Sequence, residues 1–250
     1  MRSADLTTLA RLKLAASMIQ RNQYKDCWNA ISRSENEAKR AVSGETDEDI
    51  NTQSTVYTLE MLKKHVGIGP EDVVLEIGAG VGRVGAVLAP LCREWIGVDV
   101  SENMVRHIKR RLAKFKNVRA IATNGFDLSA IPSDSVDVVY CTVVFMHLDE
   151  WERFGYIREG FRILKPKGRM MVDNVNLMSD EGWDFFVKHC ELSPRDRPPH
   201  TSRTSTPQEL LTYFSRAQFA DIRQEEFGIW IITRGSKPDP AGSPHGDPSI

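Results

Sequence analysis

The apolar residues of this chain form short continuous runs separated by longer amphipathic stretches. Helical spacing of apolar side chains is present in three stretches: residues 82–91, a segment that begins near Glu102, and residues 149–164. The short runs lack this spacing and predict buried strands; they lie at 73–77, 95–99, 118–123, 136–142 and 169–173. Strands that alternate with helices predict a parallel sheet with helices on both faces and right-handed connections.

After residue 173 the alternation stops. A helix is expected at about 180–190, followed by a polar, proline-containing segment at 193–206 and a helix from near Pro207. Two strand-like runs, 222–227 and 229–233, are separated only by Gly228. So short a connection requires an antiparallel hairpin. Residues 235–250 are rich in Gly, Pro and Ser and predict a disordered tail.

The first fifty residues predict a separate helical appendage. Helical spacing is present at about 6–19 and 25–42, an acidic, turn-rich hinge follows at 44–51, and a further helix is expected at about 52–66. The appendage has two interpretations: a helical hairpin packed on the domain edge, or a lid that excludes water from a site. The predicted organisation is therefore an appendage or lid at 1–51, a main domain at 52–234 and a tail at 235–250.

The composition limits the classes of binding partner that we expect. A chain of 250 residues, 41% hydrophobic and 27% charged, suits one globular domain with an appendage. A net charge of −1 provides no overall field for nucleic acid or an anionic membrane, so neither is expected as a partner. No segment approaches ~20 uninterrupted apolar residues. The four cysteines are far apart and form no CxxC pair, so we expect a cytoplasmic protein without a disulfide framework or metal site.

The run at 73–77 leads into Glu76-Ile77-Gly78-Ala79-Gly80-Val81-Gly82. Glycine has no Cβ, so it adopts positive φ and lets a ligand lie against bare backbone amides. The next helix points its free amides back at this turn. A nucleotide-like ligand is therefore expected there, although a dinucleotide-binding fold would also place a glycine-rich turn after its first strand. The third glycine comes one residue early for the dinucleotide pattern G-x-G-x-x-G.

Several motifs in order resemble the class I S-adenosylmethionine-dependent methyltransferases of the small-molecule type, over about residues 52–234. The motifs are Glu76 to Gly82, Gly97 to Met104, Ser133 to Tyr140 and Leu164 to Arg169. The closing antiparallel hairpin is also similar to that family. The resemblance implies an α/β fold with a Rossmann-like, doubly wound, seven-stranded sheet and an antiparallel last strand. It also implies S-adenosyl-L-methionine as the cofactor.

The resemblance implies a set of cofactor-binding positions: Glu76, Gly78, Gly80, Gly82, Asp99, Val100, Met104, Asn124, Gly125, Phe126 and Cys141. A carboxylate at the end of the second strand accepts hydrogen bonds from both ribose hydroxyls, which is the role expected for Asp99; capping the next helix is the alternative. Asn124 stands where many family members carry Asp, but an amide still accepts from the adenine amino group and donates to a ring nitrogen. Val100 and Met104 either enclose the adenine or pack as core.

His147 follows the fourth strand, where methyl donor and acceptor should meet, and is the candidate base. The alternative is a histidine that caps the following helix or lines the pocket. Asp173, with Asn174, could orient the acceptor or share the base role. Trp28 and Tyr24, with Phe145, form either an apolar wall of the site or ordinary core.

These features favour an enzyme that methylates an oxygen of a small hydroxylated or carboxylated metabolite. Protein N-methylation, including that of N-terminal amines, is the alternative within the enzyme class. A non-catalytic subunit that binds the cofactor is the alternative outside it, and the intact glycine turn with Asp99 argues against it. RNA modification ranks lower, because the basic run 109–116 is better explained as a solvated helix face.

Overall fold

The structure of the chain is a computed structural model that describes residues 23–240. The helix expected at 6–19 lies outside the described residues, and so does the tail from residue 241. Within residues 23–240, no helix has both the length and the apolar character needed to cross a membrane.

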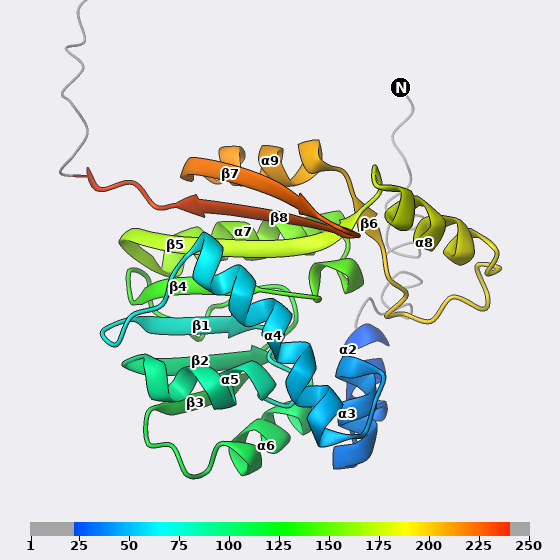
Figure 1. Ribbon diagram of the computed structural model, residues 1–250, viewed down its shortest axis with the longest axis horizontal. Helices are drawn as coiled ribbons and strands as arrows, with labels where there is room; N and C mark the ends of the chain where they lie inside the picture. The colour runs from blue at the N-terminus through cyan, green and yellow to red at the C-terminus, as the bar shows by residue number, and fades with distance from the viewer. Residues whose placement is uncertain (1–22, 241–250) are drawn as a thin grey trace, which may run out of the picture.

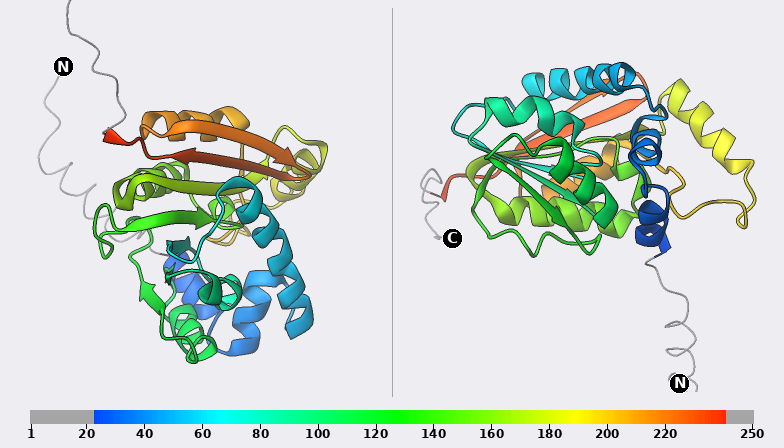
Figure 2. Two further views of the ribbon diagram at one scale, coloured as in Figure 1. Left: turned by 60° about the vertical axis from the view of Figure 1, so that its left-hand side comes forward. Right: turned by 90° about the horizontal axis from the view of Figure 1, so that it is seen from below.

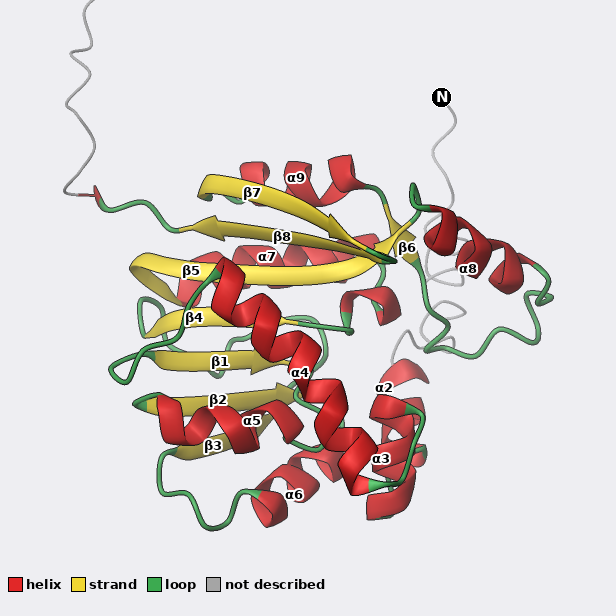
Figure 3. Ribbon diagram, viewed as in Figure 1, coloured by secondary structure: helices red, strands yellow, loops and turns green. Residues whose placement is uncertain are grey.

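A mixed sheet forms the centre of the molecule (Figure 3). Five strands are parallel: β1 (Val73–Ile77), β2 (Glu94–Asp99), β3 (Val118–Ala122), β4 (Val136–Cys141) and β5 (Leu164–Asn176). The hairpin of β7 (Ala220–Phe227) and β8 (Trp230–Ser236) completes the order β3-β2-β1-β4-β5-β8-β7, and the short β6 (Thr204–Ser205) pairs with β5. Strand β8 runs antiparallel to both neighbours, which confirms the predicted Rossmann-like fold with a reversed last strand.

Helices cover both faces of the sheet (Figure 1). Helices α4 (Glu48–His65), α5 (Arg83–Leu88) and α6 (Glu102–Arg111) pack with Val74 and Trp95 on one face. Helices α7 (Glu150–Ile163) and α9 (Pro207–Arg216) pack with Leu75 and Ile77 on the other. All five residues of β1 are buried, because its alternate side chains enter two different cores. The described chain also contains α8 (Asp180–Cys190) and the short 3₁₀ helices η1 (Ala89–Leu91) and η2 (Phe145–His147).

The predicted helix at 25–42 is two helices, α2 (Gln23–Ala30) and α3 (Glu35–Ser43). Ser34 starts the second helix, since its hydroxyl accepts from the Glu37 amide while the Glu37 carboxylate accepts from the Ser34 amide. Gly44 ends α3 at φ +78°, and Asp47 caps α4, which begins earlier than predicted. Figure 2 shows α2 and α3 at the end of the sheet from which α8 also projects.

Two boundaries near the C-terminus also differ from the expectation. Strand β8 continues through Gly235 and Ser236, which pair with Met170 and Arg169, so the predicted tail starts too early. Strand β5 starts at Leu164 and includes the turn that was expected to precede it. The amide of Lys167 donates to the Lys237 carbonyl at 2.9 Å, so the two segments stay paired beyond Ser236.

Candidate active site

A cavity of about 390 Å³ lies at the carboxyl ends of the parallel strands. Its wall includes the glycine turn, the end of β2, the connection from β4 to α7, and residues of α2, α3 and α4. The predicted site residues that line it are Glu76, Gly78, Gly80, Asp99, Val100, Met104, Gly125 and His147. In a parallel α/β sheet this is the edge where ligands bind.

The glycine turn gives the cavity a wall of bare backbone. Gly78, Gly80 and Gly82 have φ of +71°, +54° and +75°, which side-chain-bearing residues rarely adopt. The amides of Gly78 and Ala79 both donate to the Val98 carbonyl, at 2.8 and 3.0 Å, so the end of β1 is tied to β2. A Cβ on Gly80 would lie 2.8 Å from Val42 Cγ1. Helix α3 therefore approaches the turn so closely that only glycine leaves room at position 80.

Asp99 joins the glycine turn to the end of β2. Its Oδ2 accepts from the Gly80 amide at 2.9 Å and its Oδ1 accepts from the Ser101 amide at 2.8 Å. The amide hydrogen bonds lower the pKa of Asp99, but burial has the larger effect and raises it to about 6. Each carboxylate oxygen keeps a further acceptor site. The cap of α6 is Ser101, whose hydroxyl accepts from the Met104 amide, so Asp99 remains available to a ligand.

Glu76 carries a second buried carboxyl at the cavity. Its Oε2 accepts a 2.6 Å hydrogen bond from the Tyr140 hydroxyl, which itself accepts from Trp95 Nε1 at 3.3 Å. Burial raises the pKa of Glu76 to about 8, and the nearby Arg83 guanidinium acts in the opposite direction. Arg83 also lines the cavity. The glycine end of the cavity thus holds two carboxyl groups and a guanidinium.

His147 lies in η2 and lines the cavity. Its Nδ1 is 2.8 Å from the carbonyl oxygen of His200. Since a carbonyl can only accept, Nδ1 carries the hydrogen and Nε2 keeps its lone pair. Burial lowers the pKa of His147 to about 4, so the ring is neutral near pH 7. The Trp28 ring meets the imidazole edge-on, with centroids 5.0 Å apart.

Several predicted residues do not line the cavity. Asn124 uses its Oδ1 to accept from the amides of Phe126 and Asp127, both at 3.0 Å, and so closes its own loop. Phe126 is 59% exposed. The remaining ones are Gly82, Cys141 and Asp173. The Asp173 carboxylate lies buried below the cavity wall, where it accepts from the Val143 amide and the Tyr57 hydroxyl.

Helices α3 and α4 supply lining residues that the sequence did not reveal. Val42 and Ser43 come from α3, and Tyr57 and Thr58 come from α4. The Thr58 hydroxyl is 3.4 Å from that of Thr142, in the loop after β4. One signal was present in the sequence, because Thr55 and Thr58, three residues apart, place hydroxyls on the inward face of α4, and both are buried in the structure.

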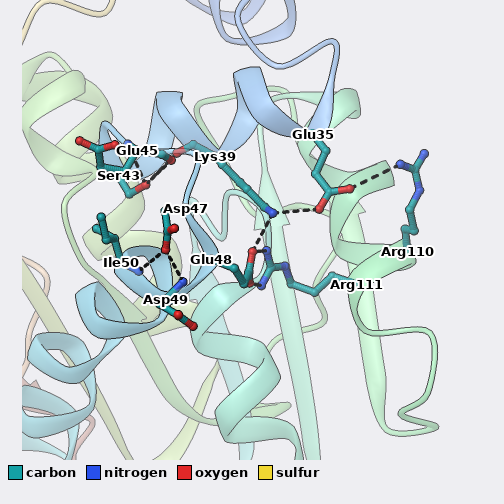
Figure 4. Close-up of polar contacts among 10 residues, drawn as sticks. All are labelled: Glu35, Lys39, Ser43, Glu45, Asp47, Glu48, Asp49, Ile50, Arg110 and Arg111. Atoms are coloured by element: carbon teal, nitrogen blue, oxygen red, sulfur yellow. Dashed lines mark hydrogen bonds and ion pairs between the residues drawn. The ribbon is translucent and has the colours of Figure 1, made fainter.

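An ion-pair network holds α3 beside the cavity (Figure 4). Glu48 is the first residue of α4. Its carboxylate accepts hydrogen bonds from the two terminal guanidinium nitrogens of Arg111, at 2.5 and 3.2 Å, and forms an ion pair with Lys39 of α3 at 2.7 Å. Glu35 adds a 3.2 Å contact to Lys39 and reaches Arg110 at 4.0 Å. The network therefore connects α3 to both α4 and α6.

Comparison with known proteins agrees with this geometry. A family model described as a methyltransferase domain matches residues 75–172. The uncharacterized methyltransferase YcgJ of Bacillus subtilis is 30% identical over 177 residues, which cover 68% of each chain. The chain belongs to the class I S-adenosylmethionine-dependent methyltransferases. A probable S-adenosylmethionine-dependent methyltransferase of Mycobacterium tuberculosis is 32% identical over 152 residues, and the match spans 60% of this methyltransferase and 49% of that relative.

Solved structures support the fold of this methyltransferase. The crystal structure of YcgJ superposes with a TM-score of 0.60 at 24% identity, covering 74% of this chain and 99% of the other. A methyltransferase in complex with the Trm112 activator of Haloferax volcanii gives 0.62 at 17% identity, covering 81% and 97%. At these identities the likeness concerns the fold alone.

The residues at the glycine end fit S-adenosylmethionine, the cofactor of this methyltransferase. Gly78 and Gly80 leave the backbone bare, Asp99 presents a carboxylate with free acceptor capacity, and Glu76 presents an acidic group. When bound, the cofactor supplies a methyl group activated by attachment to a positively charged sulfur.

Proposed function

We propose that this methyltransferase methylates a hydroxyl oxygen on a small, uncharged, ring-bearing acceptor. The observation that carries the proposal is the make-up of the cavity wall. The carboxyl and guanidinium side chains among its described lining residues are those of Glu76, Asp99 and Arg83, which lie around the glycine turn and at the end of β2. The loop after β4, with α2 and α7, contributes His147 and apolar or aromatic side chains, those of Trp28, Met146, Leu148 and Tyr156.

The size and charge of the cavity support a small, neutral acceptor. About 390 Å³ is near the lower end of the roughly 300–1,000 Å³ typical of ligand pockets. The cofactor has to share this space, so little volume is left for the acceptor. Arg83 supplies the guanidinium among the described lining residues and lies near Glu76, so a carboxylated acceptor beside Trp28 and Met146 would bury its charge without a cationic partner from these lining residues, which is costly. These features favour a hydroxylated metabolite over a carboxylated one as the acceptor, and they disfavour a protein side chain.

His147 is the proposed base. Its Nδ1 hydrogen donates to the His200 carbonyl, so Nε2 is the nitrogen able to accept a proton. An acceptor hydroxyl bound at Nε2 would give up its proton there as the oxygen gains the methyl group. Burial keeps the ring neutral near pH 7, so Nε2 is unprotonated, although the lowered pKa also makes it a weaker base than an exposed histidine. Positioning of the two reactants supplies the rest of the rate.

The test combines a base variant with a matched substrate series. His147→Ala should lower kcat by about 100-fold, the usual lower bound for general-base catalysis, and leave the calorimetric affinity for S-adenosylhomocysteine nearly unchanged. His189→Ala on α8, a histidine that does not line the cavity, serves as the control. Wild-type turnover in His147→Ala would refute the base role.

The acceptor class is tested separately with 4-ethylphenol, 4-hydroxyphenylacetate and tyramine, which share one phenol ring and differ in charge. Formation of S-adenosylhomocysteine and of the methyl ether is measured for each. We expect the neutral phenol to have the highest kcat/KM. A carboxylate or ammonium member that reacts equally well would overturn the proposed acceptor, and so would failure of the neutral phenol to bind.

A further inference from the structure

Val143 has a backbone conformation that its side chain disfavours. It is the second residue after β4, lines the cavity and has φ +59°, in the left-handed region. A β-branched residue is a rare outlier there, because its Cβ substituents crowd the neighbouring backbone. Such a conformation persists only where the surrounding structure holds it, and it is found preferentially at functional sites.

The group that holds Val143 is Asp173. The Val143 amide donates to Asp173 Oδ1 at 2.6 Å, a short hydrogen bond. Asp173 lies in the middle of β5, paired with Ile232, and is 1% exposed. The Tyr57 hydroxyl of α4 is 3.4 Å from the other carboxylate oxygen. The carboxylate is therefore fixed from the sheet on one side and from α4 on the other.

The conformation at Val143 decides where the next residues lie. Val144 packs against the glycine turn so tightly that a Cβ on Gly78 would be 2.3 Å from Val144 Cγ2. The amide of His147 then donates to the Val144 carbonyl at 2.8 Å, which starts η2. If Val143 returned to an ordinary conformation, the chain after it would change direction. Both the contact on Gly78 and the position of His147 would then be lost.

We propose that Asp173 is a positioning residue for methyl transfer, which holds Val143 in the left-handed conformation and thereby seats Val144 on Gly78 and His147 at the cavity wall. Asp173 is not among the lining residues of the cavity, so it acts through the backbone. The proposal does not depend on His147 being a base. It requires only that the loop after β4 shape the site where this methyltransferase binds its cofactor and acceptor.

The test is a double-variant cycle of Asp173→Ala and Val143→Gly. Glycine adopts positive φ without the Cβ penalty, so Val143→Gly removes the need for the restraint. We expect Asp173→Ala to weaken binding of S-adenosylhomocysteine, measured by calorimetry, and to lower kcat/KM, each by about tenfold, in line with the strain that such a conformation stores. The Asp173→Ala/Val143→Gly variant should recover most of both losses.

A purely structural role for the buried carboxylate predicts a different result, because a glycine at position 143 would not replace it. Equal losses in the single and double variants would therefore overturn the proposal, as would wild-type binding and turnover in Asp173→Ala. Asp173→Ala/Thr142→Gly controls for general loosening of the loop and should not recover. If thermal melts show that Asp173→Ala is not folded, the cycle is repeated with Asp173→Leu. The leucine side chain fills the site but accepts no hydrogen bond, so Val143→Gly should rescue this variant in the same way.

Discussion

Replacing Glu48 with glutamine would test how firmly α3 is held over the cavity. Glu48 contacts Arg111 with both carboxylate oxygens and Lys39 with one, and Arg111, the largest cause, lowers the pKa of Glu48 from 4.5 to about 2. Taken at full value, this shift corresponds to roughly 3 kcal/mol of stability. The Glu48 side chain is 48% exposed, so solvent screening reduces this figure to about 1 kcal/mol.

Glu48→Gln should therefore lower the free energy of unfolding in urea by about 1 kcal/mol at pH 7. Because the folded-state pKa is lowered, the contribution of Glu48 is complete above pH 4.5 and is lost as the pH falls toward 2. The difference between wild type and variant should accordingly shrink between pH 5 and pH 3. About 1 M salt, where the Debye length is about 3 Å, should also reduce it.

Glu60→Gln, an exposed glutamate on the same helix, is the matched control and should change stability by less than about 0.5 kcal/mol. Equal effects of the two variants at pH 7, or a difference that grows on acidification, would refute the role of the network. If α3 acts as a lid, Glu48→Gln should also speed dissociation of S-adenosylhomocysteine in stopped-flow measurements.

Two further outcomes follow from the glycine end of the cavity. Asp99→Ala should greatly reduce the calorimetric affinity for S-adenosylmethionine. In the wild type, the affinity for S-adenosylmethionine should fall as the pH drops through about 6, because protonation removes the negative charge of Asp99. Asp99→Asn should abolish this pH dependence. A wild-type affinity that does not change with pH would contradict the contact between Asp99 and the cofactor. Gly80→Val should weaken cofactor binding and shift α3, since the added side chain meets Val42; an unchanged affinity and melting temperature would argue against close packing of α3 on the turn.

Much of the fold followed from local patterns. The strand at 73–77, the glycine turn and the closing hairpin were each predicted within short segments, because burial on both faces and glycine conformation leave direct traces in sequence. The break between α2 and α3 was missed, since the apolar spacing runs across it and only the capping pair Ser34 and Glu37 marks it. The start of the tail was also misplaced, because Gly235 and Ser236 are held by pairing with β5 and not by their own propensity.

The sequence by itself indicated the class of protein and the methyl donor through several motifs in order that resemble one family, because the chemistry of each motif is carried by residue types close together in the chain. Tertiary structure alone decided what surrounds them. It brought Trp28 against His147, placed Val42 over Gly80, and set Asp173 beneath Val143. These contacts join segments distant in sequence, and no local pattern encodes a distance that depends on how helices pack against a sheet.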